Sequence, residues 1–152
     1  MKRHGGLFEK FCSFENLLEA ARKAQLGKRY QTTVSRFNFT VEQELFRLQK
    51  ELVADTYHCG TYTNFYIYEP KQRYISAAPY RDRIIHQAIC QVIAPIFEAT
   101  FIADLYSNRV GKGTHRAADY YQKNCRLNAY VLKCDISKYF SSVDKLILFK
   151  LI

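Results

Sequence analysis

The sequence predicts an α+β fold in which helices outnumber strands and the main β element is a hairpin. Three observations predict this class. Apolar residues recur at helical spacing in several segments, two β-rich runs flank a turn at EPKQ, and the apolar run AYVLKCD ends on a carboxylate. Helices should therefore supply most of the core, with the hairpin and one short strand beside them.

The first third of the chain is predicted to form two helices. Residues 13–27 have Ser13 as a cap and Gly27 as a stop, and the cap is followed by an apolar periodic stretch. Residues 40–54 begin with Thr40 as a cap, and their apolar positions are Val41, Leu45, Leu48 and Leu52. The segment between them, GKRYQTTVSRFNF, is predicted to be a basic aromatic linker.

The middle of the chain is predicted to form the hairpin. Residues 61–68 and 73–77 are rich in β-branched and aromatic types, and Pro70 marks the turn between them. Lys71 lies at the tip, with Arg73 just after it. The hairpin therefore presents two cations at its turn.

A third helix is predicted over residues 81–101, with Asp82 as its cap and Pro95 near its end. One side of it should be buried, because six apolar residues form a wide stripe: Ile84, Ile85, Ala88, Ile89, Val92 and Ile93. His86 lies on this otherwise apolar helix, and we expect it to be a hydrogen-bonded core histidine rather than a ligand.

The last third is predicted as a loop, a helix, a strand and a further helix. A glycine-bearing loop leads into a helix that Thr114 should cap, and residues 129–135 should form a strand. A helix should follow from Asp144, with Ser142 or Asp144 as its cap. A carboxylate at the end of a strand, here Asp135, can hold a catalytic metal, but it is more commonly a turn former or a helix cap.

Composition indicates a polyanionic partner. Lys and Arg number 23 against 14 Asp and Glu, which gives a formal net charge of +9. Such a surplus favours nucleic acid first and an anionic membrane surface second. The 12 Tyr and 11 Phe could stack on bases, although most aromatic side chains in a compact domain belong to the core.

Several classes are disfavoured by what the sequence lacks. The five cysteines are scattered without a C-x-x-C, so neither a zinc site nor a disulfide framework is indicated. No stretch is long enough to span a bilayer, and we expect a cytoplasmic protein with no membrane partner. GKGT does not fit the phosphate-loop pattern of nucleotide hydrolases, so that class is rejected.

Three segments together resemble the reverse transcriptase family, in particular its bacterial group II intron, retron and diversity-generating retroelement members. They are PKQRYISAAPYRDRIIHQAI, PIFEATFIADLYSNRVGKGTHRAA and YVLKCDISKYFSSVDKLIL. Their order and spacing are similar to the fingers motifs followed by the first catalytic palm motif. The resemblance implies helix-rich polymerase fingers with a β-hairpin and the beginning of a right-hand palm. The implied regions are an N-terminal helical part at 1–60, fingers at 61–128 and palm at 129–152.

The resemblance also implies the residues of a catalytic centre. Asp135 would be a metal-binding palm carboxylate and Ile136 would add its main-chain carbonyl, with Mg²⁺, or alternatively Mn²⁺, as the cofactor of two-metal nucleotidyl transfer. Phe140 would pack under the incoming sugar as a steric gate, for which core packing is the alternative. Ser137 and Tyr139 would lie beside the same nucleotide.

Basic residues complete the implied site. Lys71 and Arg73 would contact the triphosphate of a dNTP, because a basic hairpin can close on a polyanion; the alternative is a solvated turn. The implied template-contacting residues are Arg81, Arg83, Arg109, Lys112 and His115. For Arg81 and Arg83, structural pairing with Asp82 is an equal alternative.

A second palm motif of the form Y-x-D-D is missing, since no two acidic residues are adjacent in these 152. We therefore expect no polymerase activity from this chain by itself. Three interpretations stay open. The first is the fingers and initial palm of an RNA-directed DNA polymerase, present as a fragment, that binds RNA template, DNA primer and dNTP. The others are a noncatalytic basic RNA-binding module, and an interaction subunit that completes a palm in trans, or self-associates, through its apolar last helix.

Overall fold

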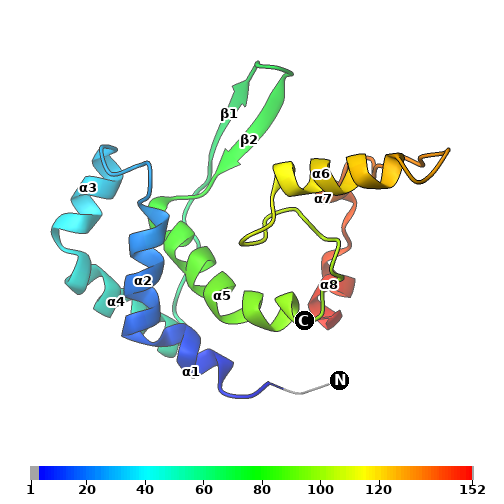
Figure 1. The fold of residues 1–152 in the computed structure, drawn as a ribbon. Helices are drawn as coiled ribbons and strands as arrows, with labels where there is room; N and C mark the ends of the chain where they lie inside the picture. Colours follow the sequence, from blue (N-terminus) through cyan, green and yellow to red (C-terminus); the bar gives the residue numbers. More distant parts are fainter. Residues whose placement is uncertain (1–3, 152) are drawn as a thin grey trace. The chain divides into compact units, whose positions relative to one another are not determined.

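The computed structural model describes residues 4–151, which divide into two compact units between Phe101 and Ile102 (Figure 1). The first unit holds five helices and the hairpin, and the second holds three helices. The chain therefore mixes helices with one small antiparallel sheet, and the α+β class is confirmed. None of the described helices combines the length and the apolar character that crossing a membrane requires.

The first two helices form as the sequence indicates. Helix α1 spans Leu7–Cys12 and α2 spans Phe14–Ala24. The Ser13 hydroxyl accepts a hydrogen bond from the Asn16 N–H at 3.2 Å, which satisfies one of the free donors at the start of α2. The predicted cap is therefore confirmed.

The segment predicted as a linker contains a helix, and that prediction was wrong. Helix α3 spans Thr32–Phe39. It is held by tertiary packing, since Val34 is fully buried and the Phe37 ring meets the Tyr80 ring edge-on at 5.3 Å. Helix α4, Val41–Val53, follows at once; Thr40 is its N-cap residue, but its side chain makes no capping hydrogen bond, contrary to expectation.

Helix α5 spans Tyr80–Glu98 and begins one residue before the predicted segment. Its N-cap residue is Pro79, so the prediction of Asp82 as cap was wrong; Asp82 lies buried in the first turn. The predicted apolar stripe is buried only in its first half, because Ile89 is already 37% exposed. His86 is exposed and is not the core histidine that we expected.

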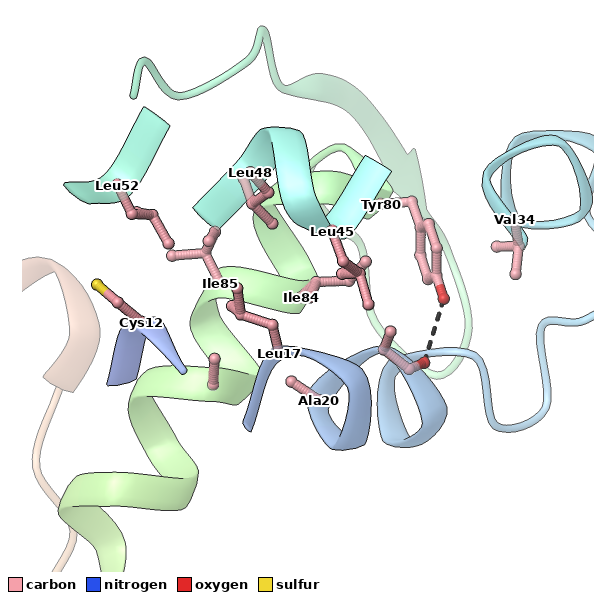
Figure 2. Close-up of a cluster of buried hydrophobic side chains, with 12 residues drawn as sticks. Cys12, Leu17, Ala20, Val34, Leu45, Leu48, Leu52, Tyr80, Ile84 and Ile85 are labelled. Carbon is pink, nitrogen blue, oxygen red and sulfur yellow. Dashed lines mark hydrogen bonds between the residues drawn. The ribbon is translucent and has the colours of Figure 1, made fainter. Parts of the chain in front are cut away.

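The core of the first unit lies between α2, α4 and α5, with α1 beside them (Figure 2). Leu17, Leu45, Leu48 and Ile84 are fully buried at its centre. The Tyr80 hydroxyl is also buried and donates a hydrogen bond to the Ala21 carbonyl at 3.2 Å, so this polar group is satisfied. The helices thus form a packed base for the exposed hairpin.

The predicted hairpin is confirmed. Strand β1 spans Thr63–Ile67 and pairs antiparallel with β2, Arg73–Ala77, in a register that places Tyr66 opposite Tyr74. Every residue of β1 is exposed. The two strands extend away from the helical core (Figure 1), so the hairpin is a surface element whose side chains are available to a partner.

The second unit contains α6, Thr114–Cys125, α7, Tyr139–Ser142, and α8, Lys145–Leu151. The N-cap residue of α6 is Gly113, and Thr114 is the first helical residue, so the prediction that Thr114 caps this helix was wrong. Among the described residues from 102 onward, no side chain is buried. Local hydrogen bonds therefore carry most of the order in this unit.

The strand predicted at residues 129–135 does not form. A strand needs a partner for its backbone groups, and the sheet in the described part of the chain contains only β1 and β2. The helix predicted from Asp144 does form, and Asp144 caps it: one carboxylate oxygen accepts from the Leu146 and Ile147 N–H groups at 2.8 and 3.1 Å. The Ser142 hydroxyl instead donates to the Tyr139 carbonyl.

Candidate nucleic-acid interface

The hairpin carries a group of exposed tyrosines next to its two cations. The Tyr66 ring lies 5.0 Å from that of Tyr74 and 6.4 Å from that of Tyr68, measured between centroids. All three rings are more than half exposed, and Lys71 and Arg73 are exposed beside them. Such a surface can stack on bases through the rings and attract phosphates through the cations.

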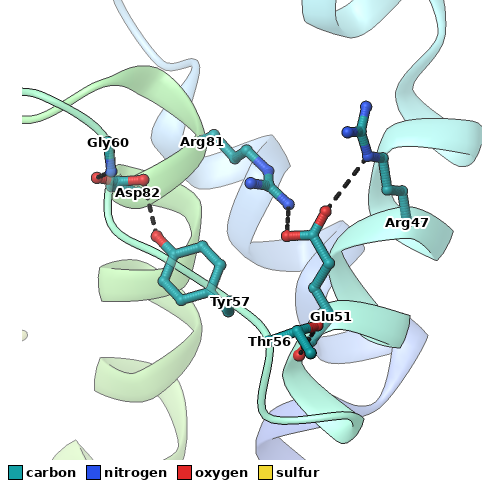
Figure 3. A network of polar contacts seen from close by, with 7 residues as sticks. All are labelled: Arg47, Glu51, Thr56, Tyr57, Gly60, Arg81 and Asp82. Carbon is teal, nitrogen blue, oxygen red and sulfur yellow. Dashed lines mark hydrogen bonds and ion pairs between the residues drawn. The ribbon is translucent and has the colours of Figure 1, made fainter.

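Both ends of the hairpin are fixed by one buried carboxylate (Figure 3). Asp82 is 2% exposed; its Oδ1 accepts from the Tyr57 hydroxyl at 2.7 Å, and its Oδ2 accepts from the Gly60 N–H at 2.8 Å. Gly60 precedes β1 and Asp82 follows β2, so these bonds tie the entry of the hairpin to its exit. We call Tyr57, Gly60, Pro79 and Asp82 the hairpin anchor.

The anchor is also closely packed. A Cβ atom added at Gly60 would lie 2.8 Å from Cγ of Pro79, so only glycine fits without a shift of the neighbouring proline ring. Burial, followed by the hydrogen bond to Asp82, raises the pKa of the Tyr57 hydroxyl. That hydroxyl therefore stays protonated and keeps donating beyond the pH at which a free tyrosine ionises.

Arg81 belongs to an ion-pair network beside the anchor (Figure 3). Its guanidinium donates to the Glu51 carboxylate, which also pairs with Arg47 Nε at 3.3 Å. The hydrogen bond from Arg81 is the main reason that the pKa of Glu51 is lowered. Arg81 also lies over the Tyr57 ring, 5.4 Å from its centroid.

Neither predicted partner of Asp82 is its partner in the structure. Arg81 pairs with Glu51, and Arg83 lies over the Tyr80 ring at 5.6 Å from the centroid. Arg83 Nε is buried and has no hydrogen-bond partner among the described residues. The alternative of pairing with Asp82 was therefore wrong for both arginines, and their contact with template stays a prediction.

The loop before α6 is held together by two of the predicted template residues. Arg109 Nη1 donates to the Ile102 carbonyl at 3.1 Å, and Lys112 Nζ donates to the Ala103 carbonyl. Lys112 also lies 4.8 Å from the centroid of the Tyr106 ring. Both cations thus have a structural role here, and any contact with template would have to share these side chains.

The remaining predicted site residues are exposed. His115 lies in the first turn of α6, and Asp135 and Ser137 lie in the irregular segment before α7. Lys138 has a φ of 51°, a left-handed conformation that turns the chain into α7. Phe140 is 94% exposed, so the alternative that it packs in the core is wrong.

The described residues do not assemble a complete metal site. No three His, Cys, Asp or Glu side chains gather within them where they could hold an ion. Asp135 and the Ile136 carbonyl could supply two ligand groups, whereas Mg²⁺ prefers six ligands in octahedral geometry. The Mg²⁺ or Mn²⁺ site therefore stays a prediction.

Comparison with known proteins adds no further assignment. No protein-family model and no curated protein matches this chain. The roles of the candidate residues consequently stay predictions that depend on their chemistry and on the motif resemblance.

Proposed function

We propose that this chain supplies the fingers of an RNA-directed DNA polymerase, which hold the RNA template, the DNA primer and the incoming dNTP. The observation that carries the proposal is the exposed hairpin, which bears Lys71 and Arg73 at its turn and is anchored at its base by Asp82. The resemblance of the three segments to reverse transcriptase motifs supports the same assignment.

Each part of the hairpin has a chemical task in this proposal. Lys71 and Arg73 bind the triphosphate through charge-assisted hydrogen bonds, and the tyrosines of β1 and β2 give bases a flat apolar surface. The anchor keeps the base of the hairpin in place when its tip takes up a ligand. Bound Mg²⁺, held in part by Asp135 and Ile136, would supply the charge neutralisation of two-metal nucleotidyl transfer.

A noncatalytic RNA-binding module is the second candidate. The observation that favours it is the tyrosine cluster of the hairpin, which could stack on RNA bases without any metal. The two candidates differ in the ligand of the cations at the tip. A polymerase finger needs them for a nucleoside triphosphate, whereas an RNA-binding module needs them only for backbone phosphates.

The test measures binding of the full chain to a labelled RNA–DNA primer–template at several salt concentrations. In the variant Lys71→Ala/Arg73→Ala we expect weaker binding. The slope of log K against log salt concentration should be smaller in magnitude by about 2, because each phosphate contact contributes about 0.9. The variant Lys10→Ala/Lys50→Ala removes the same charge from exposed positions on α1 and α4. It should keep the slope; equal slopes in both double variants would refute the proposal.

The same variants separate the two candidates when dTTP with Mg²⁺ is added to the bound duplex. Polymerase fingers require the triphosphate to bind and the hairpin variant to lose that binding. Retained RNA affinity without triphosphate binding would favour the RNA-binding module. Primer extension should be absent with this chain, and extension that disappears in Asp135→Ala would contradict that expectation.

A further inference from the structure

Helix α3 carries an open hollow on its surface, well away in sequence from the hairpin. The hollow has a volume of about 450 Å³ and is lined by Tyr30, Thr32, Ser35, Arg36 and Phe39. The hollow is wide open to solvent, so it can receive an exposed base or chain segment but cannot enclose a small ligand. None of these residues belongs to the segments that resemble reverse transcriptases.

The lining residues occupy one face of the helix. Thr32, Ser35, Arg36 and Phe39 follow the spacing i, i+3, i+4 and i+7, which places them along one side. The core contacts of α3 come from other positions, since Val34 is buried and Phe37 packs against the core cluster. The face with the hollow is therefore not needed to attach α3 to the protein.

The chemistry of the hollow fits a nucleotide. Tyr30 and Phe39 are 102% and 91% exposed, so both rings are accessible to the face of a base. Arg36 supplies a guanidinium for phosphate, and Thr32 and Ser35 supply hydroxyl groups for hydrogen bonds.

The charge of the surrounding segment points to the same class of ligand. Residues 20–41 contain no Asp or Glu, and their basic residues are Arg22, Lys23, Lys28, Arg29 and Arg36. Lys28 and Arg29 are exposed in the turn immediately before the hollow. A polyanion can therefore approach without repulsion from a carboxylate of this segment.

We propose that the hollow on α3 binds single-stranded nucleic acid, with one or two bases stacked on Tyr30 and Phe39 and a backbone phosphate on Arg36. A single strand fits better than a duplex, because only unstacked bases can place their faces on protein rings. The inference goes beyond the proposed polymerase function, since it adds a second nucleic-acid site outside the fingers motifs and does not require the hairpin to bind anything.

The test uses the full chain and a labelled oligouridine of about 12 nucleotides, with affinity measured by fluorescence anisotropy. Tyr30→Ala/Phe39→Ala should weaken binding at least about tenfold, because each base–aromatic stack contributes a factor of roughly 5 to 150, while the salt slope stays the same. Arg36→Gln should reduce the magnitude of the salt slope by about one. Tyr130→Ala/Phe149→Ala, which removes two similarly exposed rings in the second unit, is the matched control and should bind normally.

Photo-crosslinking locates the contact independently of affinity. A 4-thiouridine version of the oligonucleotide should crosslink within residues 30–39, and mass spectrometry can identify the modified peptide. Unchanged affinity in Tyr30→Ala/Phe39→Ala, or crosslinks confined to the hairpin, would overturn the inference. The primer–template measurement with Lys71→Ala/Arg73→Ala is separate, so a failure of the polymerase proposal would leave the result for the hollow standing.

Discussion

Replacing Asp82 with alanine should destabilise the protein strongly, because it removes the central acceptor of the hairpin anchor. The carboxylate is 2% exposed and accepts two hydrogen bonds, at 2.7 and 2.8 Å. A hydrogen bond to a charged group contributes about 1.5–3 kcal/mol, so losing both should cost about 3–6 kcal/mol. Domains of this kind have a total stability of about 5–15 kcal/mol, so Asp82→Ala should come close to unfolding.

A double-mutant cycle with Tyr57 isolates one of these bonds. Tyr57→Phe removes only the hydroxyl and should cost about 1.5–3 kcal/mol in the natural background. In the Asp82→Ala background the hydroxyl has already lost its acceptor, so the same change should cost little. The coupling energy between the two positions should therefore be about 1.5–3 kcal/mol.

The free energies of unfolding come from urea titrations of the full chain followed by circular dichroism, with the slope m compared between variants. Asp119→Ala, an exposed carboxylate on α6, is the control and should change stability by less than about 0.5 kcal/mol. If Asp82→Ala costs less than about 1 kcal/mol, or if the cycle with Tyr57→Phe is additive, the reasoning about the anchor is wrong.

Three further predictions concern the same region. Gly60→Ala should destabilise by about 1–3 kcal/mol, because the added Cβ meets Pro79 at 2.8 Å, while Gly5→Ala, which enters open space, should be near neutral in the same urea assay. Because the pKa of Glu51 is lowered in the folded protein, its ionised form stabilises the fold at pH values above the unfolded pKa of 4.5. This stabilisation is lost as the pH falls through the folded pKa, and Glu51→Gln should flatten this part of an acid titration of stability. Because the pKa of Tyr57 is raised in the folded protein, its protonated form stabilises the fold at pH values below the unfolded pKa of 10.0. This stabilisation is lost as the pH rises through the folded pKa, and Tyr57→Phe should remove that alkaline dependence of stability.

Elements with local causes could be predicted from the sequence. The Ser13 cap depends on a hydroxyl three residues from its donor, and the hairpin depends on a turn between two β-rich runs. Helix α3 could not be predicted in this way, because it depends on Val34 and Phe37, whose packing partners lie far along the chain. The strand expected at residues 129–135 failed for a related reason, since apolar composition says nothing about a hydrogen-bonding partner.

The candidate site was predictable to a similar extent. The exposure of Lys71 and Arg73 followed from their place at a turn, whereas the role of Asp82 did not. An aspartate near a helix start suggests a cap, but its real donors lie 22 and 25 residues earlier in the chain. The hollow on α3 could not be predicted either, because it depends on the helical form of a segment that we predicted as a linker.

The hydrogen bond from the Gly60 N–H to the Asp82 carboxylate closes residues 60–82 into a loop whose two ends meet at the helical core. The cost of closing such a loop grows only slowly with length, at about 0.6 kcal/mol for each doubling, and the loop leaves the packing of the helices unchanged. The fold should therefore tolerate insertions, deletions and new side chains at the tip as long as the hairpin anchor persists. Substitutions at the tip can therefore change ligand binding with little effect on the stability of the helical core.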